Sequence, residues 1–148
     1  MSLAREIQAK QYEMMKAGDA DKLSILRLLM SAIKNEEIAK KQPLDDAQVQ
    51  AVALAQVKQL QDALVDFETG KRDDLIKKTK AEIDFLSQFM PKQLSDEELS
   101  RVVDEVVAEL APASPQEMGK IMGAVMKKVK GQAGGNRVRE IVVRKLGP

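Results

Sequence analysis

Two residue types that often carry chemistry are missing from the sequence. Its 148 residues include no cysteine and no histidine. Their absence excludes disulfides, thiolate nucleophiles and zinc sites of the usual kind. It also removes the commonest general base of enzymes. We therefore expect no catalytic residue, no metal site and no bound cofactor.

Long apolar runs and secretory signals are missing as well. No apolar run approaches the ~20 residues needed to span a bilayer. The beginning, MSLAREIQAK, lacks the apolar core of a secretory signal. On these grounds we expect a cytoplasmic protein without a membrane-spanning segment.

The residues that are present favour helices. Aromatic residues make up only 3% of the chain, and strong helix formers such as Ala, Leu, Lys, Glu, Gln and Met dominate. Apolar positions at helical spacing predict seven helices, roughly at 2–17, 20–41, 45–69, 72–89, 96–110, 115–131 and 137–146. No stretch alternates as a strand does, so the predicted fold class is all-α.

A break near Pro91 predicts two domains. Ser95, followed by Glu98, has the spacing of a capping box that starts a new helix. Ser114, Pro115 and Glu117 repeat this device. We therefore expect an N-terminal helical bundle over residues 1–92 and a small three-helix C-terminal domain over residues 93–148.

Charge is distributed unevenly along the chain. Residues 1–90 carry 14 basic and 15 acidic groups, residues 91–110 carry 2 and 6, and residues 111–148 carry 8 and 2. This asymmetry suggests that the basic C-terminal segment meets an anionic partner. A solvated basic face without a partner explains the charge equally well.

The segment MGKIMGAVMKKVKGQAGGN, residues 118–136, combines lysines with glycines. At 100° per residue the lysines point away from the apolar face, and Gly119 and Gly123 lie on the shoulder between the two faces. A bare strip of backbone allows a neighbouring helix or a phosphate–sugar backbone to approach closely. The pattern by itself favours helix packing, and both interpretations remain open.

The turn that follows, KGQAGGNR, places three glycines beside basic residues. Glycine turns and helix N-termini present free amides that suit phosphate oxygens. Neither a P-loop nor GxGxxG is present, so a polyanion backbone is a better ligand than a nucleotide. The candidate binding residues are Gly119, Lys120, Gly123, Lys127, Lys128, Lys130, Gly131, Gly134, Gly135, Arg137 and Arg139.

Four stretches resemble the GatB/YqeY family, and specifically those members in which the module is a separate protein. They are MGKIMGAVMKKVKGQAGG, FMPKQLSDEEL, LSILRLLMSAIKNEEI and ETGKRDDLIKKTKAEIDFL, and together they cover almost the full length in the same order. The resemblance implies an all-helical fold. It also implies kinship with the tail of the B subunit of the tRNA-dependent Asp/Glu amidotransferase, which helps to hold tRNA.

From this resemblance we expect a non-catalytic protein that binds the backbone of tRNA or another structured RNA. The family label of carbon–nitrogen ligase with glutamine as amide donor is read as inherited from the larger enzyme. Two departures stand out. In the third predicted helix, relatives often carry a basic Lys-Gln-Arg cluster where this sequence reads KQLQDALVDF. In the sixth, Lys127 stands where relatives often have proline.

Two other functions are compatible with the sequence. The chain could be an adaptor that docks a protein partner on its long helices, or an accessory component of an amidotransferase. Stand-alone amidotransferase activity is not expected, because the serines lack a histidine and no serine–lysine signature is recognisable. The acidic pairs 45–46 and 73–74 are explained by helix starts.

Overall fold

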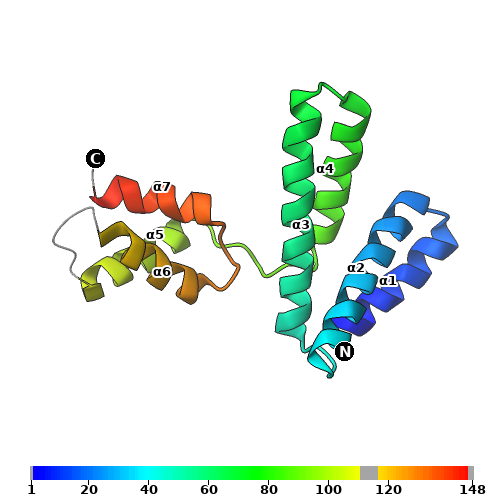
Figure 1. Cartoon of the computed structure of the whole chain (residues 1–148), viewed down its shortest axis with the longest axis horizontal. Helices are drawn as coiled ribbons and strands as arrows, with labels where there is room; N and C mark the ends of the chain where they lie inside the picture. Colours follow the sequence, from blue (N-terminus) through cyan, green and yellow to red (C-terminus); the bar gives the residue numbers. More distant parts are fainter. Residues whose placement is uncertain (1, 111–116, 147–148) are drawn as a thin grey trace. The chain divides into compact units, whose positions relative to one another are not determined.

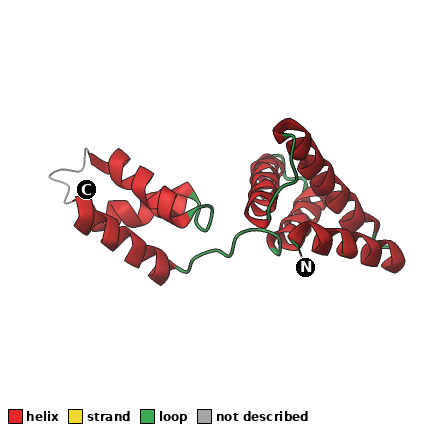
Figure 2. Cartoon of the chain, turned by 90° about the horizontal axis from the view of Figure 1, so that it is seen from below, coloured by secondary structure: helices red, strands yellow, loops and turns green. Residues whose placement is uncertain are grey.

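A computed structural model of the chain describes residues 2–110 and 117–146. Figure 2 shows helices and loops, and no strand, over these ranges. The all-α prediction is confirmed. The helices, labelled in Figure 1, are α1 Leu3–Ala17, α2 Ala20–Lys40, α3 Asp46–Thr69, α4 Asp73–Ser87, α5 Asp96–Leu110, α6 Met118–Val129 and α7 Gly135–Leu146.

Side-chain caps fix several helix starts. Ser2 accepts from the amide of Arg5, and Asp19 accepts from the amide of Lys22. Asp45 and Gln48 form a reciprocal capping box at the start of α3. The predicted starts at residues 2 and 45 were each one residue early, because those residues are caps that lie outside the helix.

Other helix boundaries also differ from the prediction; α2 ends at Lys40, α4 begins at Asp73 and α6 ends at Val129. The fourth helix ends at Ser87 instead of residue 89. The last helix begins at Gly135, before the predicted cap at Asn136, and the carbonyl of Gly134 already accepts from the amide of Val138 at 3.2 Å. The second predicted capping box, at Ser114 and Pro115, lies outside the described residues.

The chain forms two compact units, Met1–Pro91 (unit 1) and Lys92–Pro148 (unit 2). Unit 1 consists of two helical hairpins, α1–α2 and α3–α4 (Figure 1). Helix α2 contacts the other three helices and places Leu26 and Leu29 in the core, where both are completely buried. Val49 from α3 and Leu86 from α4 complete the centre of that core.

The described residues of unit 2 form a three-helix arrangement in which each helix contacts the other two. Its core is built mainly from valine, with Leu99 and Ile121 as its largest fully buried side chains. The sequence of the unit contains no aromatic residue. This small aliphatic core leaves one broad face of each helix exposed, and those faces carry the charged residues.

Candidate nucleic-acid interface

Helix α6 has one apolar and one basic face. Ile121, Val125 and Val129 are buried in the core of unit 2. The glycines Gly119 and Gly123 and the lysines Lys120, Lys127, Lys128 and Lys130 are all exposed. The lysines therefore point to solvent, as the helical spacing indicates.

Gly119 and Gly123 face open space. A Cβ atom added at either position would meet nothing within 4 Å in the part of the chain that the structure describes. No helix of that part packs on Gly119 and Gly123, which we call the glycine strip, so packing among the described helices does not account for these glycines.

The turn between α6 and α7 contains two residues with a left-handed backbone conformation. Gly131 has φ +82°, a left-handed value that favours glycine, and Lys130 has φ +42°. The amide of Gln132 donates to the carbonyl of Val129 at 2.8 Å. This amide is therefore already hydrogen-bonded, and fewer amides of the turn are left to bind a phosphate oxygen.

The same turn holds the segment that precedes α5. Its carbonyls accept two hydrogen bonds, one from Gln93 Nε2 to Gly131 at 3.0 Å and one from the Leu94 amide to Gln132 at 2.8 Å. We call this set of contacts, together with the contact from Arg137 described next, the junction clasp. The motif FMPKQLSDEEL contained Gln93 and Leu94, but their role here was missed because their partners lie 38 residues further along the chain.

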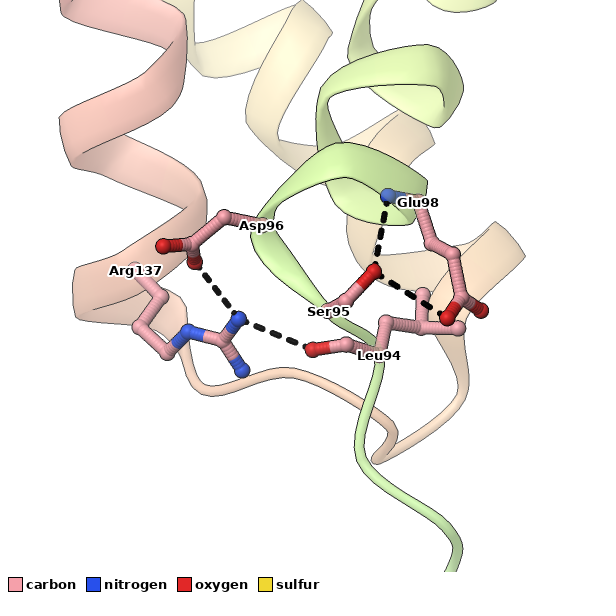
Figure 3. Close-up of polar contacts among 5 residues, drawn as sticks. All are labelled: Leu94, Ser95, Asp96, Glu98 and Arg137. Atoms are coloured by element: carbon pink, nitrogen blue, oxygen red, sulfur yellow. Dashed lines mark hydrogen bonds and ion pairs between the residues drawn. The ribbon is translucent and has the colours of Figure 1, made fainter.

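Arg137 completes the junction clasp (Figure 3). Its Nη2 donates to the Leu94 carbonyl and to Asp96 Oδ1, both at 2.8 Å. Beside it, Ser95 Oγ accepts from the Glu98 amide and donates to Glu98 Oε1, both at 3.1 Å. Ser95 is thus the predicted cap, although Glu98 accepts from the serine hydroxyl and not from the backbone.

Lys128 and Lys145 form further ion pairs with α5. Lys128 Nζ lies 3.1 Å from Glu109 and 3.7 Å from Glu105, and Lys145 Nζ lies 2.6 Å from Asp104. The acidic and basic segments that the sequence separates thus meet in one unit, whose 10 basic and 8 acidic residues leave a net charge of +2. Much of the charge expected to attract a partner is neutralised internally.

Four predicted contact residues keep their charge available. Within the described ranges, Lys120, Lys127, Lys130 and Arg139 are exposed and form no ion pair. Gly134 and Gly135 stand at the start of α7 with open space around them. The eleven candidates therefore fall into two sets. The available set lies on the outer face of α6 and around the start of α7. The other set, which includes Lys128 and Arg137, already contacts other residues of unit 2.

Among the described residues, one carboxyl group has a clearly shifted pKa, and it lies in unit 1. Burial raises the pKa of Glu82, nearby Asp21 raises it further, and Lys78 opposes the shift. Glu82 lines a groove between α2 and α4 together with Ile25 and Phe85. Within the described ranges, no cluster of acidic side chains has the arrangement of a metal site. None of the described helices combines the length and the hydropathy of a membrane span.

Comparisons with known proteins give a family and named relatives. The model of the family YqeY, described as Yqey-like protein, matches residues 4–146. The protein named altered inheritance of mitochondria protein 41, mitochondrial, from Saccharomyces cerevisiae (strain YJM789) is 32% identical over 105 residues, which are 70% of this chain and 56% of the relative. Its namesake from Candida glabrata is 31% identical over 119 residues, 76% of this chain and 65% of the relative.

A more distant relative of the same name, from Pyrenophora tritici-repentis, is 24% identical over 129 residues, 86% of this chain and 71% of the relative. The chain thus spans just over half the length of the first Saccharomyces relative and about two thirds of the Candida relative.

The expectation of a cytoplasmic protein is wrong on these findings, because the relatives are named as mitochondrial proteins. That expectation used only the lack of a long apolar run and of a secretory signal. Neither property distinguishes the cytoplasm from the interior of an organelle.

Proposed function

We propose that this chain, which belongs to the YqeY family of Yqey-like proteins, is a non-catalytic protein that binds the phosphate–sugar backbone of structured RNA. The resemblance of unit 2 to the tail of a tRNA-dependent amidotransferase makes tRNA the first RNA to test. The binding surface is the outer face of α6 together with the start of α7.

The open glycine strip carries the proposal. A glycine inside a helix costs about 1 kcal/mol against alanine, and Gly119 and Gly123 gain no packing in the described part of the chain in return. A bare backbone beside Lys120 and Lys127 suits close approach of a polyanion. Phosphate contacts of this kind position a protein on a nucleic acid without reading its sequence.

Composition supports recognition of the backbone over recognition of bases. Unit 2 has no aromatic side chain, whereas proteins that bind single strands stack bases on aromatic rings. Affinity must then come from electrostatics and the release of counterions. With Lys120, Lys127, Lys130 and Arg139 as the contacts, the log–log dependence of affinity on salt should have a slope of about −3 to −4.

The test compares tRNA binding of the wild type, the double variant Lys120→Gln/Lys127→Gln and the control Lys34→Gln/Lys58→Gln in unit 1. Each lost phosphate contact should reduce the steepness of the salt slope by about 1. The first double variant should therefore show a slope shallower by about 2, for every RNA sequence alike, while the control should match the wild type. Salt-independent binding, or equal affinity for all three proteins, would sink the proposal.

Lys128 is deliberately left unchanged in this design. Its charge reversal would place a third carboxylate beside Glu105 and Glu109, and like charges in contact destabilise the folded state. A loss of binding would then not be separable from a loss of folding.

The proposed role is non-catalytic because the sequence offers no cysteine or histidine for a nucleophile–base pair. The carbon–nitrogen ligase label of the family would follow from kinship with the larger enzyme. Glutamine-dependent amidation of misacylated tRNA by the pure chain would overturn this part of the proposal.

An adaptor role is the second candidate. Leu28 and Ile38 on α2 are 57% and 64% exposed, which suits a protein partner for unit 1. Co-elution with a protein in the absence of RNA, together with no measurable tRNA affinity, would favour it.

A further inference from the structure

A second surface of unit 2 lies between α5 and α7. Two ion pairs join these helices, Asp96 with Arg137 and Asp104 with Lys145. Both pairs connect residues 41 positions apart, so α5 and α7 run parallel in a fixed register. One member of each pair, Asp96 and Lys145, lines a groove with a volume of about 520 Å³.

The lining of this groove combines arginines with an apolar wall. Arg101 from α5 and Arg144 from α7 lie on opposite sides, and neither forms an ion pair with a described residue. Half-buried Ser100 and buried Ile141 also line the groove. A guanidinium group binds a carboxylate through two parallel hydrogen bonds, and Ile141 offers a contact for an apolar side chain.

The groove is separate from the glycine strip. Helix α6 contributes no residue to it, and the outer face of α6 points away from the side that packs on α5 and α7. A ligand in the groove and an RNA on α6 would therefore contact different surfaces of unit 2.

From this arrangement we infer that the α5–α7 groove binds a short acidic segment of a protein partner, with carboxylates on Arg101 and Arg144 and an apolar side chain against Ile141. A continuous polyanion fits less well. Six of the eight carboxylates of unit 2 stand on α5, and two of them, Asp96 and Glu97, line the groove itself, so an extended phosphate backbone would meet repulsion along the helix. One or two carboxylates placed at the arginines would avoid most of it.

The experiment titrates the isotope-labelled full chain with an acetylated and amidated hexapeptide that carries two glutamates among leucines, and follows amide chemical shifts. Saturable shifts should concentrate at Ser100, Arg101 and Arg144. A matched peptide with glutamine in place of glutamate should bind about tenfold more weakly, because charged hydrogen bonds are lost.

Variants separate this inference from the proposed RNA surface. Arg101→Gln/Arg144→Gln should weaken binding of the leucine–glutamate peptide about tenfold or more, with an unchanged melting temperature and unchanged tRNA affinity. Lys120→Gln/Lys127→Gln should have the opposite effect, with peptide binding intact and tRNA binding reduced.

Three results would overturn the inference. They are equal affinity for the two peptides, absence of saturable shifts at the groove amides, and a loss of tRNA affinity in the arginine double variant. The last would assign the groove to the RNA surface. Failure of tRNA binding alone would refute the proposed function and leave the groove inference standing.

Discussion

The two units use charge in different ways. In unit 1 every ion pair among the described residues joins positions at most four apart, as in Lys10–Glu13 and Lys40–Glu36. In unit 2 every such pair joins different helices, as in Lys128–Glu109 and Arg137–Asp96. Local pairs support single helices, whereas the pairs of unit 2 fix how its helices are aligned.

The two units also differ in the composition of their cores. Unit 1 places Phe89 with leucines and isoleucines in its core, and Phe85 packs edge-on against Phe89 with ring centroids 6.1 Å apart. Unit 2 fills its core largely with valine. A core of uniform side chains distinguishes alternative helix alignments less sharply than a mixed one, so the cross-helix ion pairs would add to the difference between the correct register and shifted ones.

The largest expected effect is on the smaller core. Leu99→Ala, at a fully buried position, should destabilise unit 2 by about 2–5 kcal/mol, while the control Leu26→Ala should destabilise unit 1 by a similar amount. Hydrogen exchange read residue by residue should show each loss confined to its own unit. A single cooperative unfolding step that involves both units in both variants would contradict independent cores.

The next effect compares a cross-helix pair with a local one. Arg137→Met removes two hydrogen bonds of the guanidinium group but keeps its apolar stem, and should lower the free energy of unfolding of unit 2 by about 1–2 kcal/mol. Lys40→Met removes only an i, i+4 pair and should cost at most about 0.5 kcal/mol. Urea denaturation measures the free energy of unfolding of both variants. Equal losses would show that the cross-helix pair stabilises the fold no more than the local pair does.

Two glycines of the basic segment should respond in opposite directions. Gly123→Ala should stabilise unit 2 by about 0.5–1 kcal/mol, because its Cβ enters open space and alanine favours the helix. Gly131→Ala should destabilise it by about 1 kcal/mol, since φ is +82°. Melting temperatures report the sign of each change.

One of these two variants also tests the proposed function. Gly123→Ala should weaken tRNA binding although the protein becomes more stable, which separates a binding role from a structural one. Unchanged tRNA affinity in this variant would show that the open strip does not contact RNA.

The smallest effect is a pH dependence in unit 1. The pKa of Glu82 is raised by burial, so the folded state binds its proton more tightly and the ionised carboxylate disfavours folding. Stability from this group is lost as pH rises through the folded pKa. Glu82→Gln should therefore stabilise the protein at pH 7, by less than about 0.5 kcal/mol, and the gain should vanish below about pH 4, where both states are protonated.

The helices of the fold could be predicted because their signals are local. Gly18 ends α1 in the left-handed conformation, and Asp45 caps α3, as their residue types indicate. The α6 face followed from helical spacing for the same reason. The start of α7 was missed because the residue before it, Gly134, has no side chain that could cap the helix, and only its carbonyl, which accepts from the amide of Val138, marks the helix start.

The partners of the candidate residues could not be predicted. Lys128 pairs with α5 across 19 residues and Arg137 pairs with Asp96 across 41, and no periodic pattern in the sequence reports such distances. The sequence thus indicates which residues are charged and which face they occupy. It does not indicate which of them the rest of the unit has already neutralised.

The junction clasp also determines how tension would travel through the chain. Met90 packs against the core of unit 1 and Leu94 against that of unit 2, so only three residues separate the two anchors. Tension on this short connection would not reach α5 first. It would pass through Gln93 and Leu94 into the turn between α6 and α7, and through Arg137 into the first turn of α7, which makes this corner the mechanical attachment point of unit 2.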